Sequence, residues 1–162
     1  MGHLRRCSAL AVELKKSGAT VIFLCRVSGI DIVAELAGIA DEASLMDWRT
    51  IPEHDAREVA RTYEELGVDV AVIDHYRVDS EYQQHLLASG VRWMQFDWSA
   101  RQPLWANWVL NASFGADESV YQSLKRREET ILLLGPQYVP IRPDFGNWRS
   151  RVKFREDVAT IL

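Results

Sequence analysis

Residues 68–76, VDVAVIDHY, contain the pattern that decides the fold. The run from Val68 to Ile73 is apolar apart from one aspartate, and short β-branched runs of this kind are typical of a strand covered on both faces. Asp74, His75 and Tyr76 follow at once. Because ligands bind beyond the carboxyl ends of the strands in an open α/β sheet, the stretch predicts a buried strand with a candidate site at its end.

Strands and helices alternate along the rest of the chain. Similar apolar runs predict further strands at Thr20–Cys25, Val91–Phe96, Trp108–Leu110 and Thr130–Leu134. Apolar residues at helical spacing predict helices at residues 4–17, 30–39, 53–66, 80–88 and 118–125. This alternation predicts an α/β fold, with an open, mostly parallel, Rossmann-like sheet and helices on both of its faces.

Both ends of the sequence depart from the pattern of a complete doubly wound domain. We expect residues 1–155 to form a Rossmann-like domain without its first strand, because the chain opens on a loop–helix junction at Gly2 and His3. Residues 156–162 include the apolar run Val158–Leu162, which predicts the start of a strand leading to an absent second domain. We therefore interpret the chain as the N-terminal half of a two-domain protein.

Composition narrows the classes of function. The chain has 162 residues, 48% hydrophobic and 26% charged, as in an ordinary globular domain. Its formal net charge of -4 gives no general attraction to a polyanion, so we expect no nucleic-acid partner. The apolar runs are far shorter than the ~20 residues that cross a bilayer, so we expect no membrane partner. Because the sequence also lacks a secretory signal, we expect a cytoplasmic location. Cys7 and Cys25 have no metal-ligand spacing, so we expect free buried thiols. We also expect no metal and no cofactor.

Two groups of residues are candidates for chemistry. His3 stands just ahead of the first predicted helix, where a neutral imidazole could accept a proton from water, although a histidine so near a terminus is more often solvated. Asp74 could orient an imidazole or accept from a sugar hydroxyl, and Tyr76 could pack against a sugar ring. The alternative is that Asp74 caps a turn and that His75 and Tyr76 are surface packing.

Other polar and aromatic residues give weaker signals. Asp97 also follows a predicted strand, so its carboxylate could share an edge of the sheet with Asp74. The tryptophans are too scattered to define a sugar-binding surface, and we expect most of them in the core or at an interface.

Several motifs, taken in order, resemble those of one family, the UDP-sugar hydrolases of pseudaminic acid biosynthesis known as PseG, with the related spore-coat polysaccharide proteins called SpsG. The opening residues resemble the family pattern GHxxRCxxLA through Gly2-His3, Arg6-Cys7 and Leu10-Ala11. The later matches are Asp74-His75-Tyr76, Asn111, the segment 134–138 (LGPQY) and Arg142-Pro143. The resemblance spans almost the whole chain.

The resemblance implies a reaction and a set of site residues. The reaction is attack of water at the anomeric carbon of a UDP-2,4-diacetamido-2,4,6-trideoxyhexose, which releases UDP and the free sugar. His3 matches the family's catalytic histidine. The candidate substrate-binding residues are Gly2, Arg6, Asp74, His75, Tyr76, Asp97, Asn111 and Tyr138. The implied architecture is the N-terminal half of a GT-B fold, in which a second domain or subunit binds much of the nucleotide.

The chain also departs from the family. Family members place a strand and a glycine-rich loop ahead of the histidine, and many have paired aspartates where this chain has Asp97-Trp98. Two other functions therefore stay open. The chain could be a non-catalytic sugar-nucleotide binding or interaction module, or it could be half of a GT-B glycosyltransferase, since one fold serves both reactions.

Overall fold

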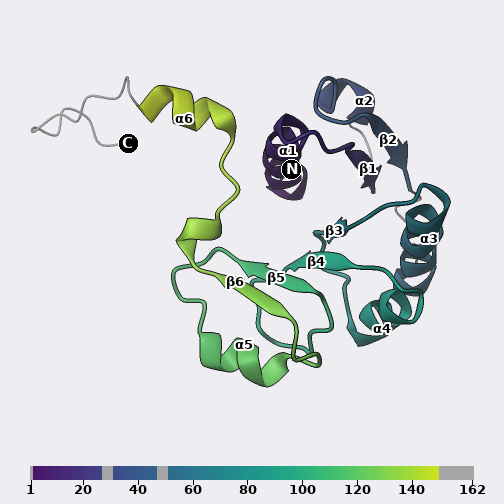
Figure 1. Cartoon of the computed structure of the whole chain (residues 1–162), viewed down its shortest axis with the longest axis vertical. Helices are drawn as coiled ribbons and strands as arrows, with labels where there is room; N and C mark the ends of the chain where they lie inside the picture. Colours follow the sequence, from purple (N-terminus) through teal and green to yellow (C-terminus); the bar gives the residue numbers. More distant parts are fainter. Residues whose placement is uncertain (1, 27–30, 47–50, 150–162) are drawn as a thin grey trace, which may run out of the picture.

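The computed structural model describes residues 2–26, 31–46 and 51–149, whose strands form two parallel sheets. In the smaller sheet, β1 (Ile22–Cys25) pairs with β2 (Glu42–Leu45). In the larger sheet, β3 (Ala71–Ile73), β4 (Trp93–Phe96), β5 (Trp108–Asn111) and β6 (Ile131–Leu134) lie side by side in chain order (Figure 1). Every strand pair is parallel. The predicted parallel, Rossmann-like α/β class is confirmed.

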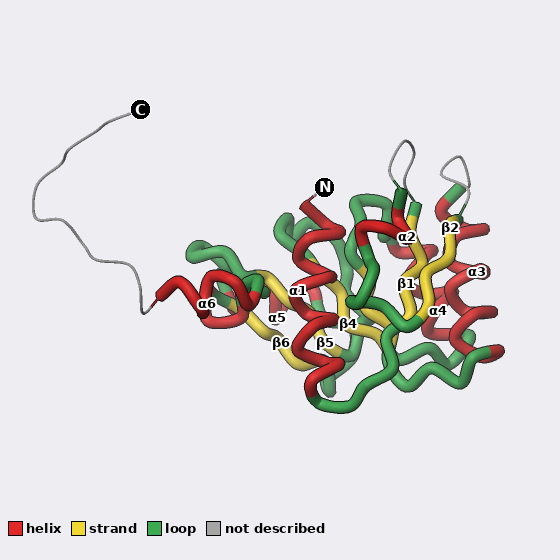
Figure 2. The backbone as a smooth tube through the Cα atoms, turned by 90° about the horizontal axis from the view of Figure 1, so that it is seen from above, coloured by secondary structure: helices red, strands yellow, loops and turns green. Residues whose placement is uncertain are grey.

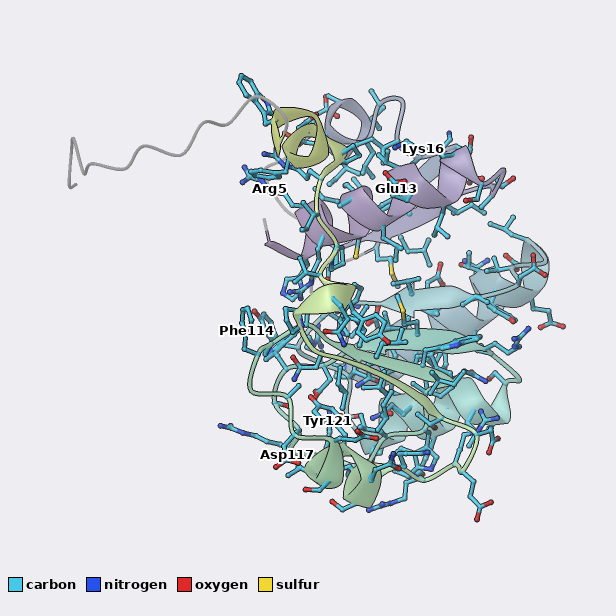
Figure 3. The ribbon with its side chains drawn as sticks, turned by 60° about the vertical axis from the view of Figure 1, so that its left-hand side comes forward. Arg5, Glu13, Lys16, Phe114, Asp117 and Tyr121 are labelled. Carbon is cyan, nitrogen blue, oxygen red and sulfur yellow. The ribbon has the colours of Figure 1, made fainter. Side chains whose placement is uncertain are left out.

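Helices cover both faces of the larger sheet. The helices are α1 (Gly2–Lys16), α2 (Ile32–Glu35), α3 (Pro52–Glu65), α4 (Ser80–Ala88), α5 (Glu118–Leu124), the 3-10 helix η1 (Pro136–Tyr138) and α6 (Pro143–Arg149). Helix α1 lies on one side of this sheet, and α4 and α5 lie on the other (Figure 1). On α1, Lys16 donates to Glu13 at 2.7 Å, on an exposed face (Figure 3). The prediction of helices on both faces is therefore correct.

The structure contains elements that the sequence did not predict. Strand β2 was not predicted, because its sequence EASL is half polar and mostly exposed, without a continuous apolar run. Helix α6 has no counterpart among the predicted helices, and it stands apart from both sheets, with Phe145 58% exposed (Figure 2). The strand expected at Val158–Leu162 lies outside the described residues.

The single sheet that we expected is divided in two. Strand β1 pairs with β2 and strand β3 pairs with β4, and no described strand lies between β1 and β3. Each of these two strands therefore has one edge whose backbone groups take no part in a described ladder. The candidate site lies at the carboxyl end of β3, where side chains of α1 meet it.

Most of the core lies between the larger sheet and the helices α3, α4 and α5. Trp93 and Val109 of the sheet lie in this core and have no exposed surface. Leu86 of α4 is also fully buried and belongs to the same cluster. A separate, small core beneath β1 contains Cys25, Ile32 and Leu36, with Leu4 of α1 packed against it. Among the tryptophans, most of which we expected in the core or at an interface, Trp93 is fully buried, whereas Trp98 is 38% and Trp148 59% exposed.

Two adjacent leucines of α4 give a test of this core. Leu86 is fully buried, whereas Leu87 is 38% exposed. Leu86→Ala should lower the free energy of unfolding by about 2–5 kcal/mol, because it removes buried methyl groups and leaves a cavity. Leu87→Ala, with the same change of helix propensity, should lower it much less. Urea unfolding of both variants measures the difference, and equal losses would contradict this placement of α4.

Candidate functional site

The start of α1 meets the end of β3 at one buried carboxylate. Nδ1 of His3 lies 2.7 Å from Oδ1 of Asp74, and Nε and Nη2 of Arg6 each lie 2.5 Å from one of the two carboxylate oxygens. The Asp74 side chain is 2% exposed, while those of His3 and Arg6 are 30% exposed. Two polar side chains from the first turns of α1 therefore converge on an aspartate that is inaccessible from solvent.

Asp74 fixes the tautomer of His3. An ionised carboxylate only accepts hydrogen bonds, so Nδ1 of His3 must donate to it. Nη2 of Arg6, 2.9 Å from the same nitrogen, is then a close neighbour rather than a donor to it. The lone pair of the imidazole consequently resides on Nε2, which no described hydrogen bond engages. A histidine held in this way can accept a proton at Nε2.

The surroundings keep Asp74 ionised. Burial by itself would raise the pKa of this carboxyl, but the hydrogen bonds from Arg6 and His3 outweigh that effect and hold the pKa below its ordinary value. The same pairing raises the pKa of Arg6. The carboxylate is thus a permanent hydrogen-bond acceptor for His3 at neutral pH.

Cys7 borders the site as a neutral thiol. Its Sγ donates to Oδ2 of Asp74 at 3.5 Å. Burial raises the pKa of this thiol to about 12, with the adjacent carboxylate contributing further. Because the thiolate is the reactive form, Cys7 is not a nucleophile at neutral pH. Cys7 and Cys25 are both free, as the sequence predicts.

Two aromatic rings flank His3. Tyr76 contacts it edge-on, with ring centroids 4.6 Å apart, and Trp98 lies 5.7 Å from it. Trp98 was not predicted as a site residue, because the tryptophans are scattered along the sequence. The signal that would have identified it is its position one residue beyond Asp97, at the carboxyl end of the strand next to β3.

The side chain of His75 belongs to a different cluster from those of its sequence neighbours, Asp74 and Tyr76. Its Nδ1 accepts from the backbone N–H of Arg77 at 3.2 Å, so Nε2 carries the hydrogen. That nitrogen lies 3.4 Å from Oδ2 of Asp55, which is ion-paired with Arg26, and 3.4 Å from the hydroxyl of Tyr82. Burial, followed by the charges of Arg26 and Arg77, lowers the pKa of His75 to about 4. His75 is thus a neutral residue that links β3 with α3 and α4.

Asp97 and Asn111 belong to a third, buried cluster. The hydroxyl of Tyr121 donates to Oδ2 of Asp97 at 2.5 Å and accepts from Nδ2 of Asn111 at 2.8 Å. Tyr121 reaches them from α5 (Figure 3). Asp97 is 8% and Asn111 5% exposed, and Asp97 also accepts from the backbone of Ala100. No described contact joins Asp97 to Asp74.

The structure therefore brings together only part of the predicted site. His3, Arg6, Asp74 and Tyr76 meet, with the addition of Trp98. Gly2 is the first residue of α1, so His3 lies within its first turn rather than ahead of it. Tyr138 is 39% exposed in η1, beyond the end of β6, and makes no described contact with His3. Within the described ranges, we find no group of metal-binding side chains.

Comparison with known proteins gives one distant relative. The chain is 22% identical over 146 residues to the uncharacterized protein MJ1062 of Methanocaldococcus jannaschii. The matched region is 90% of this chain but 29% of that protein, so the chain spans less than a third of the relative's length. No protein-family model matches the chain. None of the helices in the described residues is long and apolar enough to cross a membrane.

The cluster around His75 should make stability depend on pH. The pKa of an unfolded histidine is near ~6.5, whereas that of His75 in the folded chain is about 4. Between these values the unfolded chain binds more protons, so the free energy of unfolding should fall as the pH is lowered through this window. Above the window the contribution of the neutral imidazole is complete.

Urea unfolding midpoints measured across this window test the prediction. His75→Gln should flatten the dependence, while His85→Gln, outside the cluster, should keep it. A His75→Gln variant with the same pH dependence as the unaltered chain would show that His75 is not the group responsible.

Proposed function

We propose that this chain is the N-terminal half of a nucleotide-sugar hydrolase that releases UDP from a UDP-2,4-diacetamido-2,4,6-trideoxyhexose. The single observation that carries the proposal is the His3–Asp74 pair, in which the buried carboxylate fixes Nδ1 and leaves Nε2 as the acceptor. The substrate comes from the resemblance of the motifs around these residues. The proposed location of the reaction is the cytoplasm.

In the proposed reaction, Nε2 of His3 takes a proton from a water molecule as the water oxygen attacks the anomeric carbon. The bond between that carbon and the diphosphate oxygen breaks, and UDP leaves with the bonding electrons. The carboxylate of Asp74, 2.7 Å from Nδ1, keeps its hydrogen bond to the ring and stands opposite the positive charge that forms on the imidazolium. Arg6 holds the carboxylate in place by two hydrogen bonds.

Two observations support the view that another part of the protein completes the site. No described strand pairs with the outer edge of β1 or of β3, which supports the expectation that a further strand belongs between them. The charge on the departing diphosphate also requires donors that the described cluster does not supply, because Arg6 is already paired with Asp74. We assign that role to the second domain or subunit, with the predicted substrate-binding residue Tyr138 at the end of the sheet that would face it.

Release of UDP from the UDP-linked diacetamido sugar tests the catalytic role of His3. His3→Gln should lower the rate by about a hundredfold or more, because the amide cannot take the proton from water. The variant's circular dichroism spectrum serves as the control for folding. Turnover that survives this change would refute the assignment. Binding without turnover would favour the binding-module alternative, and transfer to an added acceptor would favour a glycosyltransferase.

Asp74→Asn tests the role of the carboxylate. An amide can donate to Nδ1 and so place the hydrogen on Nε2, which removes the proton acceptor. We expect a loss of about 10²–10⁴-fold in the rate of UDP release. Asp79→Asn is the matched control, because Asp79 is the N-cap of α4 and asparagine caps equally well. Equal rates for the two variants would show that Asp74 does not set the tautomer of His3.

A further inference from the structure

Trp98 and Tyr76 form a continuous aromatic surface beside His3. Their ring centroids are 4.8 Å apart, with the rings at 76° to one another, and each ring also contacts the imidazole. Tyr76 is 77% exposed and Trp98 is 38% exposed. The two residues follow the neighbouring strands β3 and β4, so the paired sheet sets their spacing. A molecule lying on this surface is in direct reach of His3.

The charges around the surface favour an uncharged occupant. The guanidinium of Arg6 lies 4.7 Å from the centroid of the Trp98 ring, but its charge is balanced by the buried carboxylate of Asp74. A diphosphate placed here would find no unbalanced cation in the cluster formed by His3, Arg6 and Asp74. An uncharged ring with an apolar face would instead bury that face against the aromatic side chains.

We infer that Trp98 is a substrate-positioning residue and that, with Tyr76, it binds the apolar face of the sugar ring. This inference rests on the proposed function, because it takes the sugar of the nucleotide-sugar as the occupant. The C–H bonds of a pyranose and the methyl groups of its acetamido and 6-deoxy positions supply the apolar contact. The surface thereby selects the sugar and holds its anomeric carbon beside His3, while the nucleotide extends away from it.

Ligand-observed saturation-transfer NMR with the UDP-linked diacetamido sugar tests this inference on the full chain. Saturation should reach the sugar ring and its methyl groups more strongly than the uridine. Trp98→Leu should weaken binding of the nucleotide-sugar by about tenfold, and Trp98→Phe, which retains an aromatic ring, should restore most of it. Trp108→Leu is the matched control. Trp108 also packs against an arginine, Arg92 at 5.5 Å, but it is the first residue of β5 and so lies at the amino ends of the strands, away from Trp98.

A second measurement avoids dependence on the folding of any leucine variant. The indole N–H signal of Trp98, assigned by its loss in Trp98→Phe, should shift when the nucleotide-sugar is added to the unaltered chain, and that of Trp108 should not. The ring signals of His3 at fixed pH, compared between the unaltered chain and Trp98→Leu, report whether the pair with Asp74 is intact.

The outcomes separate the two proposals. Binding of the nucleotide-sugar with a silent Trp98 signal and unchanged affinity in Trp98→Leu would overturn the inference and leave the proposed hydrolase intact. UDP release that does not depend on His3, together with sugar contact at Trp98, would overturn the hydrolase mechanism and leave the binding surface. Absence of any binding by the chain would overturn the inference.

Discussion

The structure depends on one constraint, the need to balance the charge of Asp74 in a place that water does not reach. Removing a carboxylate from water is costly unless charged or hydrogen-bonded partners replace the solvent. Here the partners are Arg6 and His3, both on α1, while the carboxylate belongs to the end of β3. The requirement therefore fixes α1 against the sheet. It also orients the imidazole, and in the proposed reaction the same contacts serve proton transfer.

Much of this arrangement could be predicted from the sequence, because it depends on local patterns. The apolar runs give the strands, and a parallel sheet places Asp74 and Asp97 at the same edge. The partners could not be predicted, because they depend on rotamers and register. Asp97 turns inward to Tyr121 and Asn111, whereas the next residue, Trp98, turns toward His3. Strand β2 escaped prediction because an exposed edge strand lacks the apolar run that identifies a central one.

The motif Asp74-His75-Tyr76 shows how three consecutive residues can have separate roles. Asp74 faces α1, His75 faces Asp55 on α3, and Tyr76 projects into solvent with 77% of its surface exposed. Successive side chains at the end of a strand point in different directions, so adjacency in sequence does not imply a common site. A short motif can thus combine a buried ion-pair partner, a structural link and an exposed aromatic ring.

The division of the strands into two sheets has a consequence for cooperativity. No described backbone ladder joins β1 and β2 to the larger sheet, and the small core around Cys25, Ile32 and Leu36 is separate from the main one. A unit attached in this way opens at a lower free energy than the rest of the molecule. Its attachment includes the ion pair between Arg26 and Asp55, so protonation of that carboxyl loosens it. We therefore expect a fall in pH to open this smaller unit before the rest of the molecule.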